Sequence, residues 1–124
     1  MKICVTSQGD TLDAAVDPRF GRAACFLLID TDSMAFEVFT NTALEAGGGV
    51  GIMAAKLVID AGAQTVLTGN CGPNAFRTLQ AGGVQVCTGI TGTVKQAIEA
   101  FVSGSLTPDT QASVQSHSGM EQQG

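Results

Sequence analysis

Residues 65–75 read TVLTGNCGPNA, and this stretch decides the expected fold of the chain. The apolar run 65–68 is typical of a buried strand, and Gly69 follows it as a tight turn. Pro73 fits the first turn of a helix, because its ring presets the helical backbone angle and its missing N–H needs no partner there. A strand, a glycine turn and a helix in succession predict a layered α/β domain that binds ligands at the carboxyl edge of its sheet.

The rest of the chain supplies further elements of both kinds around this stretch. We expect strands over residues 2–7, 24–30, 35–40, 65–68 and 84–88, and helices over 50–61, 73–81 and 94–103. The second and third strands form an antiparallel hairpin, and the later strands alternate with helices through right-handed crossovers. The predicted fold is a mixed five-stranded sheet of order 3-2-1-4-5 with helices on both faces. The loops after strand one, before helix one and before helix two then converge at one edge.

Two of the expected helices begin without a capping side chain. The third helix has its own capping box, with Thr93 as N-cap and Gln96 three residues later. Three glycines at 47–49 precede the first helix and Gly72 precedes the second, although Asn70 could cap the second helix if it began early. Uncapped N–H groups and the helix dipole favour an anion, with water as the alternative partner. The sequence therefore predicts anion binding at this edge.

Composition narrows the function classes. The chain has 124 residues, 44% of them hydrophobic, and a formal charge of −5, which argues against a nucleic-acid binder and against an anionic membrane surface. No apolar run approaches the roughly 20 residues of a membrane span. Residues 2–7 form a strand rather than the apolar segment of a secretory signal, so we expect a cytoplasmic protein. We also expect a monomer. Residues 1–104 are expected to form one domain and residues 105–124 a disordered polar tail, which contains the single histidine, His117.

The four cysteines form no metal or redox motif, because no C-x-x-C spacing occurs. Cys4, Cys25 and Cys87 lie in apolar runs and are expected to pack as small hydrophobic groups. Cys71 alone lies in a loop. As a nucleophile it would need a nearby base, and the only histidine lies in the predicted tail, so we expect no enzyme. A structural thiol and a soft contact to a metal or sulfide both remain open for Cys71.

The long loop 8–22 places Arg19 and Arg22 on either side of Phe20 and Gly21. Arginine suits oxyanions and polarisable anions, although a surface arginine is commonly paired with a carboxylate. The carboxylates available for such pairing in this loop are Asp10, Asp13 and Asp17. We expect at least one of the two arginines to face a ligand.

Four segments resemble the dinitrogenase iron–molybdenum cofactor biosynthesis family, the group of NifX, the C-terminal domain of NifB, NafY and the orange proteins of sulfate reducers. They are DPRFGR at 17–22, GGGVG at 47–51, LTGNCGPNA at 67–75 and AGGVQV at 81–86. The resemblance covers about residues 1–102, and its motifs are specific in combination rather than singly.

The resemblance implies a ribonuclease-H-like α/β fold without nuclease activity, since Cys4 and Thr6 stand where nuclease chemistry would need carboxylates. It also implies binding or carriage of a molybdenum- or iron-containing sulfide cluster. The orange-protein branch implies a molybdenum–copper sulfide cluster that is held non-covalently, with the iron–molybdenum cofactor or a precursor as the alternative. An interaction module in a multiprotein assembly, and a thiol enzyme using Cys71, are the competing functions.

The expected site lies on the edge formed by residues 10–22, 47–53 and 70–74 and combines arginines, backbone amides and soft or apolar contacts. The predicted cofactor-binding residues are Arg19, Phe20, Arg22, Gly48, Gly49, Val50, Gly51, Ile52, Met53, Asn70, Cys71, Gly72 and Asn74, of which Cys71 is also the predicted metal contact.

Overall fold

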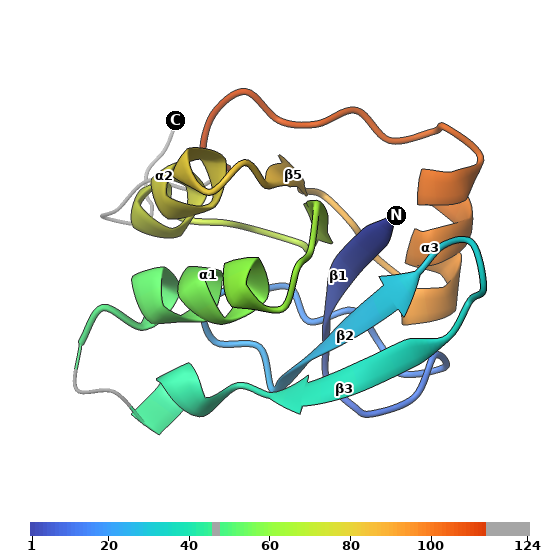
Figure 1. Ribbon diagram of the computed structural model, residues 1–124, viewed down its shortest axis with the longest axis horizontal. Coiled ribbons are helices and arrows are strands. Elements are labelled where there is room, and N and C mark those ends of the chain that lie inside the picture. The colour runs from blue at the N-terminus through green and yellow to red at the C-terminus, as the bar shows by residue number, and fades with distance from the viewer. Residues whose placement is uncertain (46–47, 114–124) are drawn as a thin grey trace.

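A five-stranded mixed sheet forms the centre of the protein in the computed structural model, which describes residues 1–45 and 48–113 (Figure 1). The strands are β1 (Lys2–Ser7), β2 (Cys25–Asp30), β3 (Phe36–Thr40), β4 (Thr65–Leu67) and β5 (Gln85–Cys87). Their order is β3-β2-β1-β4-β5. The helices are η1 (Thr42–Glu45, a 3-10 turn), α1 (Val50–Asp60), α2 (Pro73–Ala81) and α3 (Val94–Val102). The predicted α/β fold and strand order are confirmed.

The strand directions bring four strand ends to one edge of the sheet. β2 is antiparallel to both β1 and β3, so β1 and β3 run the same way. β4 is parallel to β1, and β5 is parallel to β4. The carboxyl ends of β1, β3, β4 and β5 therefore lie together, and the loops that leave them share this edge.

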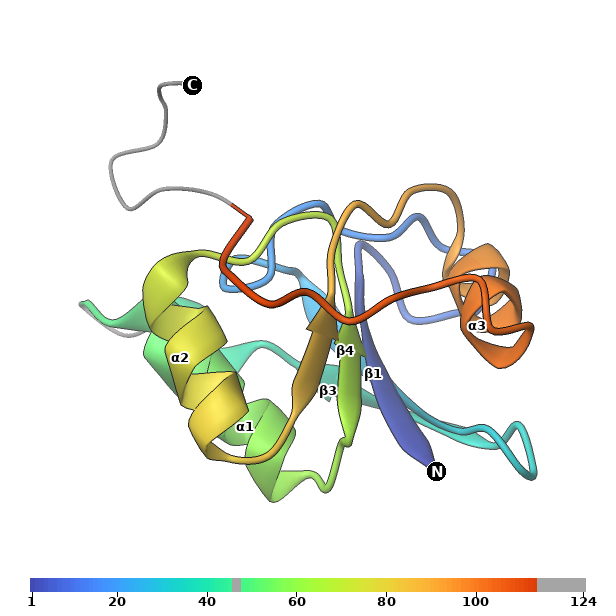
Figure 2. The ribbon, with the colours of Figure 1, turned by 90° about the horizontal axis from the view of Figure 1, so that it is seen from above.

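The sheet separates two apolar cores, because successive side chains of a strand point to opposite faces. On one face Phe26 and Leu28 of β2 pack with residues of α1 and α2. On the other face Leu27 and Ile29 pack with Val94 and other buried residues of α3. Figure 2 shows α1 and α2 on one side of the sheet and α3 on the other. The expected placement of helices on both faces is confirmed.

The element boundaries differ little from those expected. Helix α1 ends at Asp60, and Gly62 follows with a φ of 90°, a left-handed conformation that glycine adopts without strain and that commonly ends a helix. The 3-10 turn η1 occupies part of the expected loop 41–49. Within the described residues, none of the helices combines the length and the apolar character that a membrane crossing requires.

Of the predicted disordered tail, residues 105–113 lie against the edge of the sheet, and residues 114–124 lie outside the described part of the chain together with His117. The segment 105–113 runs from α3 past β5, where the N–H of Asp109 donates to the carbonyl oxygen of Val86 at 2.7 Å. Its low apolar content indicated disorder, but hydrogen bonds to the edge of the sheet hold it in place.

Candidate functional site

The long loop after β1 is anchored where β1 and β4 lie side by side. The hydroxyl oxygen of Thr6 is 2.8 Å from the carbonyl oxygen of Asp17 and 2.8 Å from the hydroxyl oxygen of Thr68. The N–H of Asp17 donates to the carbonyl oxygen of Thr6 at 2.9 Å. Both threonines are fully buried. These contacts bring the second half of the loop back over the carboxyl end of β4.

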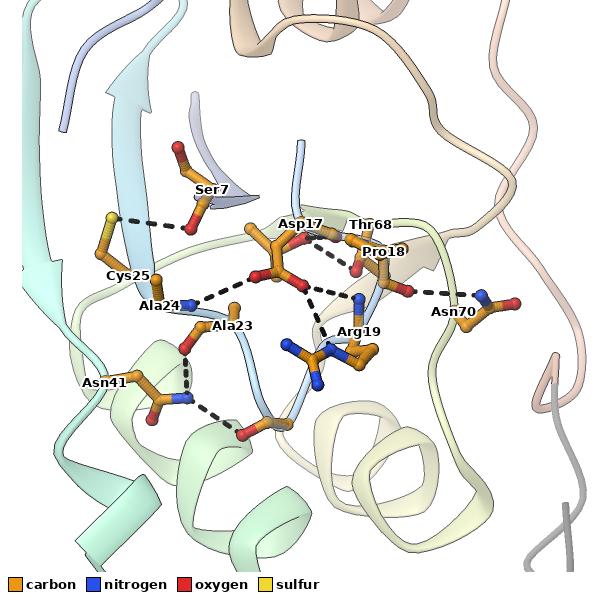
Figure 3. Close-up of polar contacts among 12 residues, drawn as sticks. Ser7, Asp17, Pro18, Arg19, Ala23, Ala24, Cys25, Asn41, Thr68 and Asn70 are labelled. Atoms are coloured by element: carbon orange, nitrogen blue, oxygen red, sulfur yellow. Dashed lines mark hydrogen bonds and ion pairs between the residues drawn. The ribbon is translucent and has the colours of Figure 1, made fainter. Parts of the chain in front are cut away.

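Residues 17–22 then lie directly against the turn that follows β4. The N–H of Phe20 donates to the carbonyl oxygen of Asn70 at 3.0 Å. The side-chain amide of Asn70 donates to the carbonyl oxygen of Pro18 at 3.3 Å, as Figure 3 shows. Gly69 permits this approach, because a Cβ there would lie 2.6 Å from the Cα of Pro18. A side chain at this position would force the two segments apart.

The buried carboxylate of Asp17 holds the backbone of the arginine-bearing segment, residues 17–22, in place. The residue is 3% exposed, and its carboxylate accepts hydrogen bonds from the N–H of Arg19 at 3.0 Å and the N–H of Ala24 at 3.3 Å (Figure 3). The Nε of Arg19 lies 3.7 Å from the same carboxylate. The side chain of Arg19 is nevertheless 64% exposed, so its guanidinium group is held at one end and open to solvent at the other.

The first turn of α1 lies between the arginine-bearing segment and the first turn of α2. A Cβ at Gly21 would lie 3.1 Å from the Cα of Gly51, and a Cβ at Gly51 would lie 3.3 Å from the Cβ of Ala75. Residues 17–22, 48–53 and 69–74 thus form one continuous surface, here called the rim. These contacts show that the three loops converge, as the sequence predicted.

Both helices that start at the rim lack a side-chain cap. The N-cap of α1 is Gly49, with a φ of 67°, and the N-cap of α2 is Gly72; neither helix start receives a side-chain hydrogen bond. Asn70 does not cap α2, because its side chain donates to Pro18. Helix α3 has the predicted capping box. The rim therefore presents two helix N-termini whose first N–H groups and dipoles favour an anion.

The predicted site residues fall into exposed, half-buried and buried groups. The exposed residues are Arg19, Arg22, Gly48, Gly49, Met53, Asn70 and Asn74, and the half-buried ones are Val50, Gly51, Ile52 and Gly72. Phe20 and Cys71 are each 1% exposed.

The side chain of Phe20 is buried in the core rather than exposed on the rim. Its ring packs against that of Phe26, with 5.7 Å between the ring centroids, and it belongs to the core under α1 and α2. Its position between two arginines in the sequence predicted a contact to the cofactor. Burial of the ring instead stabilises the loop that carries the arginines. The apolar contribution to the rim comes instead from Ile52 and Met53, the latter 46% exposed.

Cys71, the predicted metal contact, is buried rather than exposed on the rim, which favours the structural thiol over a direct contact. Burial, with a smaller contribution from the negative charge of Asp109, raises the pKa of the Cys71 thiol to about 12. A metal bound to Cys71 would have to displace this proton. All four cysteines are free and buried. Across residues 1–45 and 48–113, no group of three or more His, Cys, Asp or Glu side chains is placed to hold a metal ion.

Several residues that organise the rim were not among the predicted site residues. Asp17 carries a sequence signal, because an aspartate that bonds the N–H two residues later is a common turn former. The buried amide of Asn41 donates to the carbonyl oxygens of Gly21 and Ala23, at 3.0 and 2.9 Å. Ser113 receives a hydrogen bond from the N–H of Cys71 at 2.8 Å. Asn41 is 20 residues from its partner Gly21 in the sequence and Ser113 is 42 residues from its partner Cys71, and no motif marks either contact.

A cavity of about 500 Å³ lies away from the rim, between α1 and strands β2 and β3. Its lining is mostly apolar and includes Cys4, Phe26 and Leu57. No predicted site residue lines this cavity, so it does not contribute to the candidate site.

Comparison with known proteins gives a consistent set of relatives. Residues 1–104 match the model of the family described as dinitrogenase iron-molybdenum cofactor. The apo orange protein of Desulfovibrio gigas is 41% identical, with a TM-score of 0.87 over 90% of this chain and 94% of the other. A putative NifB protein of Thermotoga is 36% identical, with a TM-score of 0.75 over 86% and 91%. An uncharacterized protein of Methanocaldococcus jannaschii is 28% identical over 86% of this chain and 89% of its own.

Proposed function

The chain belongs to the dinitrogenase iron-molybdenum cofactor family, and we propose that it binds and carries an anionic metal–sulfide cluster at the rim. The family and the orange-protein neighbour support a cofactor-binding or carrier role for a metal cluster. In this role the cluster is cargo, and the protein performs no catalytic step.

The observation that carries the proposal is the meeting of two uncapped helix starts with two exposed arginines. The first turns of α1 and α2 present N–H groups at the same surface as Arg19 and Arg22. Sulfide-rich anions are large and polarisable, so dispersed donors and a guanidinium group suit them better than a compact ammonium group. Exposed Met53 and half-buried Ile52 add soft and apolar contact.

The strength of such a site follows from its parts. Each helix N-terminus contributes at most ~1–2 kcal/mol to an anion, and each charge-assisted hydrogen bond ~1.5–3 kcal/mol. Two of each come to roughly 5–10 kcal/mol before the cost of ordering the arginines, which corresponds to weak or moderate affinity. The site is therefore suited to release its cargo as well as to bind it.

We propose a molybdenum–copper sulfide cluster as the cargo, with the iron–molybdenum cofactor or a precursor as the alternative. The orange protein is 41% identical over 90% of this chain, which supports the first choice. The burial of all four cysteines supports a cluster that arrives complete and is held through hydrogen bonds and charge. A cargo that needed a thiolate ligand would require Cys71 to leave its buried position.

Titration of the metal-free protein with tetrathiomolybdate and copper, followed by visible absorption, tests this proposal. We expect a coloured complex that stays with the protein through gel filtration. The double variant Arg19→Ala/Arg22→Ala should weaken binding by at least about tenfold, since each lost charged hydrogen bond costs ~1.5–3 kcal/mol.

The matched control is Lys56→Ala/Lys95→Ala, which also removes two positive charges, but from exposed positions on α1 and α3 outside the rim. This control should bind within about twofold of the wild type at moderate salt, because separated surface charges are screened. Equal losses in the two double variants would mean that only net charge matters, and would contradict a site at the rim. A colourless wild-type protein would refute the proposed cargo.

A further inference from the structure

We propose that residues 105–113, here called the strap, position the rim by holding the backbone of Cys71, so that Ser113 acts as a positioning residue for cluster binding. This inference rests on the proposed function for its consequence, but the contact itself can be tested without any cluster. The family match ends at residue 104, so the strap lies beyond the matched part of the chain.

The strap is attached at both ends and in the middle. Leu106 packs against the core beneath α3, and Ala112 packs against the core beneath α1 and α2. Between them the N–H of Asp109 donates to the carbonyl oxygen of Val86, and the hydroxyl of Thr88 donates to the carboxylate of Asp109. The strap therefore crosses the outer edge of β5 from one face of the sheet to the other, as Figures 1 and 2 both show.

The last contact of the strap falls on the turn that belongs to the rim. The N–H of Cys71 donates to the hydroxyl oxygen of Ser113 at 2.8 Å, and the N–H of Ser113 donates to the carbonyl oxygen of Cys71 at 3.1 Å. The two groups form a reciprocal clamp on one residue. Cys71 is itself 1% exposed, although it follows exposed Asn70 directly.

The clamp matters because of where Cys71 stands in the chain. Asn70, the residue before it, holds the arginine-bearing segment through Phe20 and Pro18. Gly72, the residue after it, is the N-cap of α2. Fixing the backbone of Cys71 thus fixes the distance and angle between one arginine-bearing segment and one helix start. Preorganisation of this kind raises affinity by reducing the ordering cost of binding.

Amide hydrogen exchange by NMR on the metal-free full-length protein tests the clamp. Ser113→Ala should speed exchange of the Cys71 amide by roughly 2- to 10-fold, the range for one protein hydrogen bond. Ser113→Thr keeps the hydroxyl and should restore slow exchange. Thr107→Ala removes an exposed hydroxyl from the same strap and should leave the Cys71 amide unchanged.

Titration of the same four proteins with tetrathiomolybdate and copper tests the consequence. Ser113→Ala should bind about threefold or more weakly, as expected when one positioning hydrogen bond is lost. Ser113→Thr and Thr107→Ala should bind like the wild type. A purely structural contact would lower stability and leave affinity unchanged.

The outcomes separate the two proposals. Unchanged exchange at Cys71 in Ser113→Ala overturns the clamp whether or not the wild type binds a cluster. Faster exchange with equal or tighter cluster binding overturns the positioning role, since the strap would then be neutral or would compete for the Cys71 amide. Failure of the wild type to bind refutes the proposed function and with it the role of Ser113 in binding, while the exchange data still decide the clamp.

Discussion

Replacing Gly69 by alanine should loosen the rim, because a Cβ at this glycine would overlap backbone atoms of the arginine-bearing segment. The added Cβ would lie 2.6 Å from the Cα of Pro18 and 2.8 Å from its carbonyl oxygen. Both neighbours are backbone atoms, so a change of side-chain rotamer cannot relieve the overlap. The two segments must separate by roughly 0.8 Å to reach ordinary contact.

The expected cost has two parts. Overpacking of this kind costs about 1–3 kcal/mol. The separation also stretches the hydrogen bond from the N–H of Phe20 to Asn70, which is 3.0 Å long in the structure, and that loss adds about 1 kcal/mol. We expect Gly69→Ala to lose about 2–4 kcal/mol, which leaves it folded if the wild type has the usual 5–15 kcal/mol.

Urea unfolding followed by circular dichroism measures this loss as a lower midpoint at an unchanged slope. Gly48→Ala is the matched control, because it is also on the rim and a Cβ there meets nothing within 4 Å. The same two proteins should differ in cluster binding, with Gly69→Ala the weaker. Equal stability of the two variants to within about 0.5 kcal/mol would refute the claim that close approach at Gly69 assembles the rim.

Three further predictions concern residues in and around the rim. Asp17→Ala should lower stability by about 1–3 kcal/mol in urea unfolding, because the N–H groups of Arg19 and Ala24 lose their acceptor; a neutral result would contradict it. The raised pKa of Cys71, about 12 against an ordinary value of 9.0, means that the unfolded chain loses this proton first, so stability should fall from pH 9 toward pH 12. Cys71→Ala should make that fall shallower by up to ~1.4 kcal/mol per pH unit, and an unchanged slope would mean that the thiol ionises normally. Thr93→Ala should lower stability by ~1 kcal/mol through loss of the capping box while leaving cluster binding unchanged, and weaker binding would place α3 in the site.

The fold could be predicted from the sequence because it depends on regular patterns. The buried run in β2 and the apolar spacing of α3 follow from the periods of strand and helix, and short connections allow few topologies. The convergence of loops at one edge follows from the strand directions alone. The uncapped starts at Gly49 and Gly72 could also be predicted, because capping depends on one or two local residues.

The parts that could not be predicted depend on contacts between distant segments. Phe20 lies in a loop without periodicity, so its burial follows only from the way the loop folds back onto β4. The strap has the composition of a disordered tail, and its order depends on hydrogen bonds to Val86 and Cys71 that no local pattern indicates. Cys71 was predicted to be an accessible contact because it stands in a turn, yet the strap and the core cover it.

The central claim is that this chain carries a metal–sulfide cluster, and elemental analysis of protein isolated from its native source tests it most directly. The measurement combines metal and sulfide content with the visible absorption spectrum of the purified protein. The account predicts a coloured protein that contains molybdenum, copper and sulfide in fixed proportion, and iron with molybdenum would indicate the alternative cargo. A colourless protein without metal or sulfide, isolated under conditions that preserve such clusters, would contradict it.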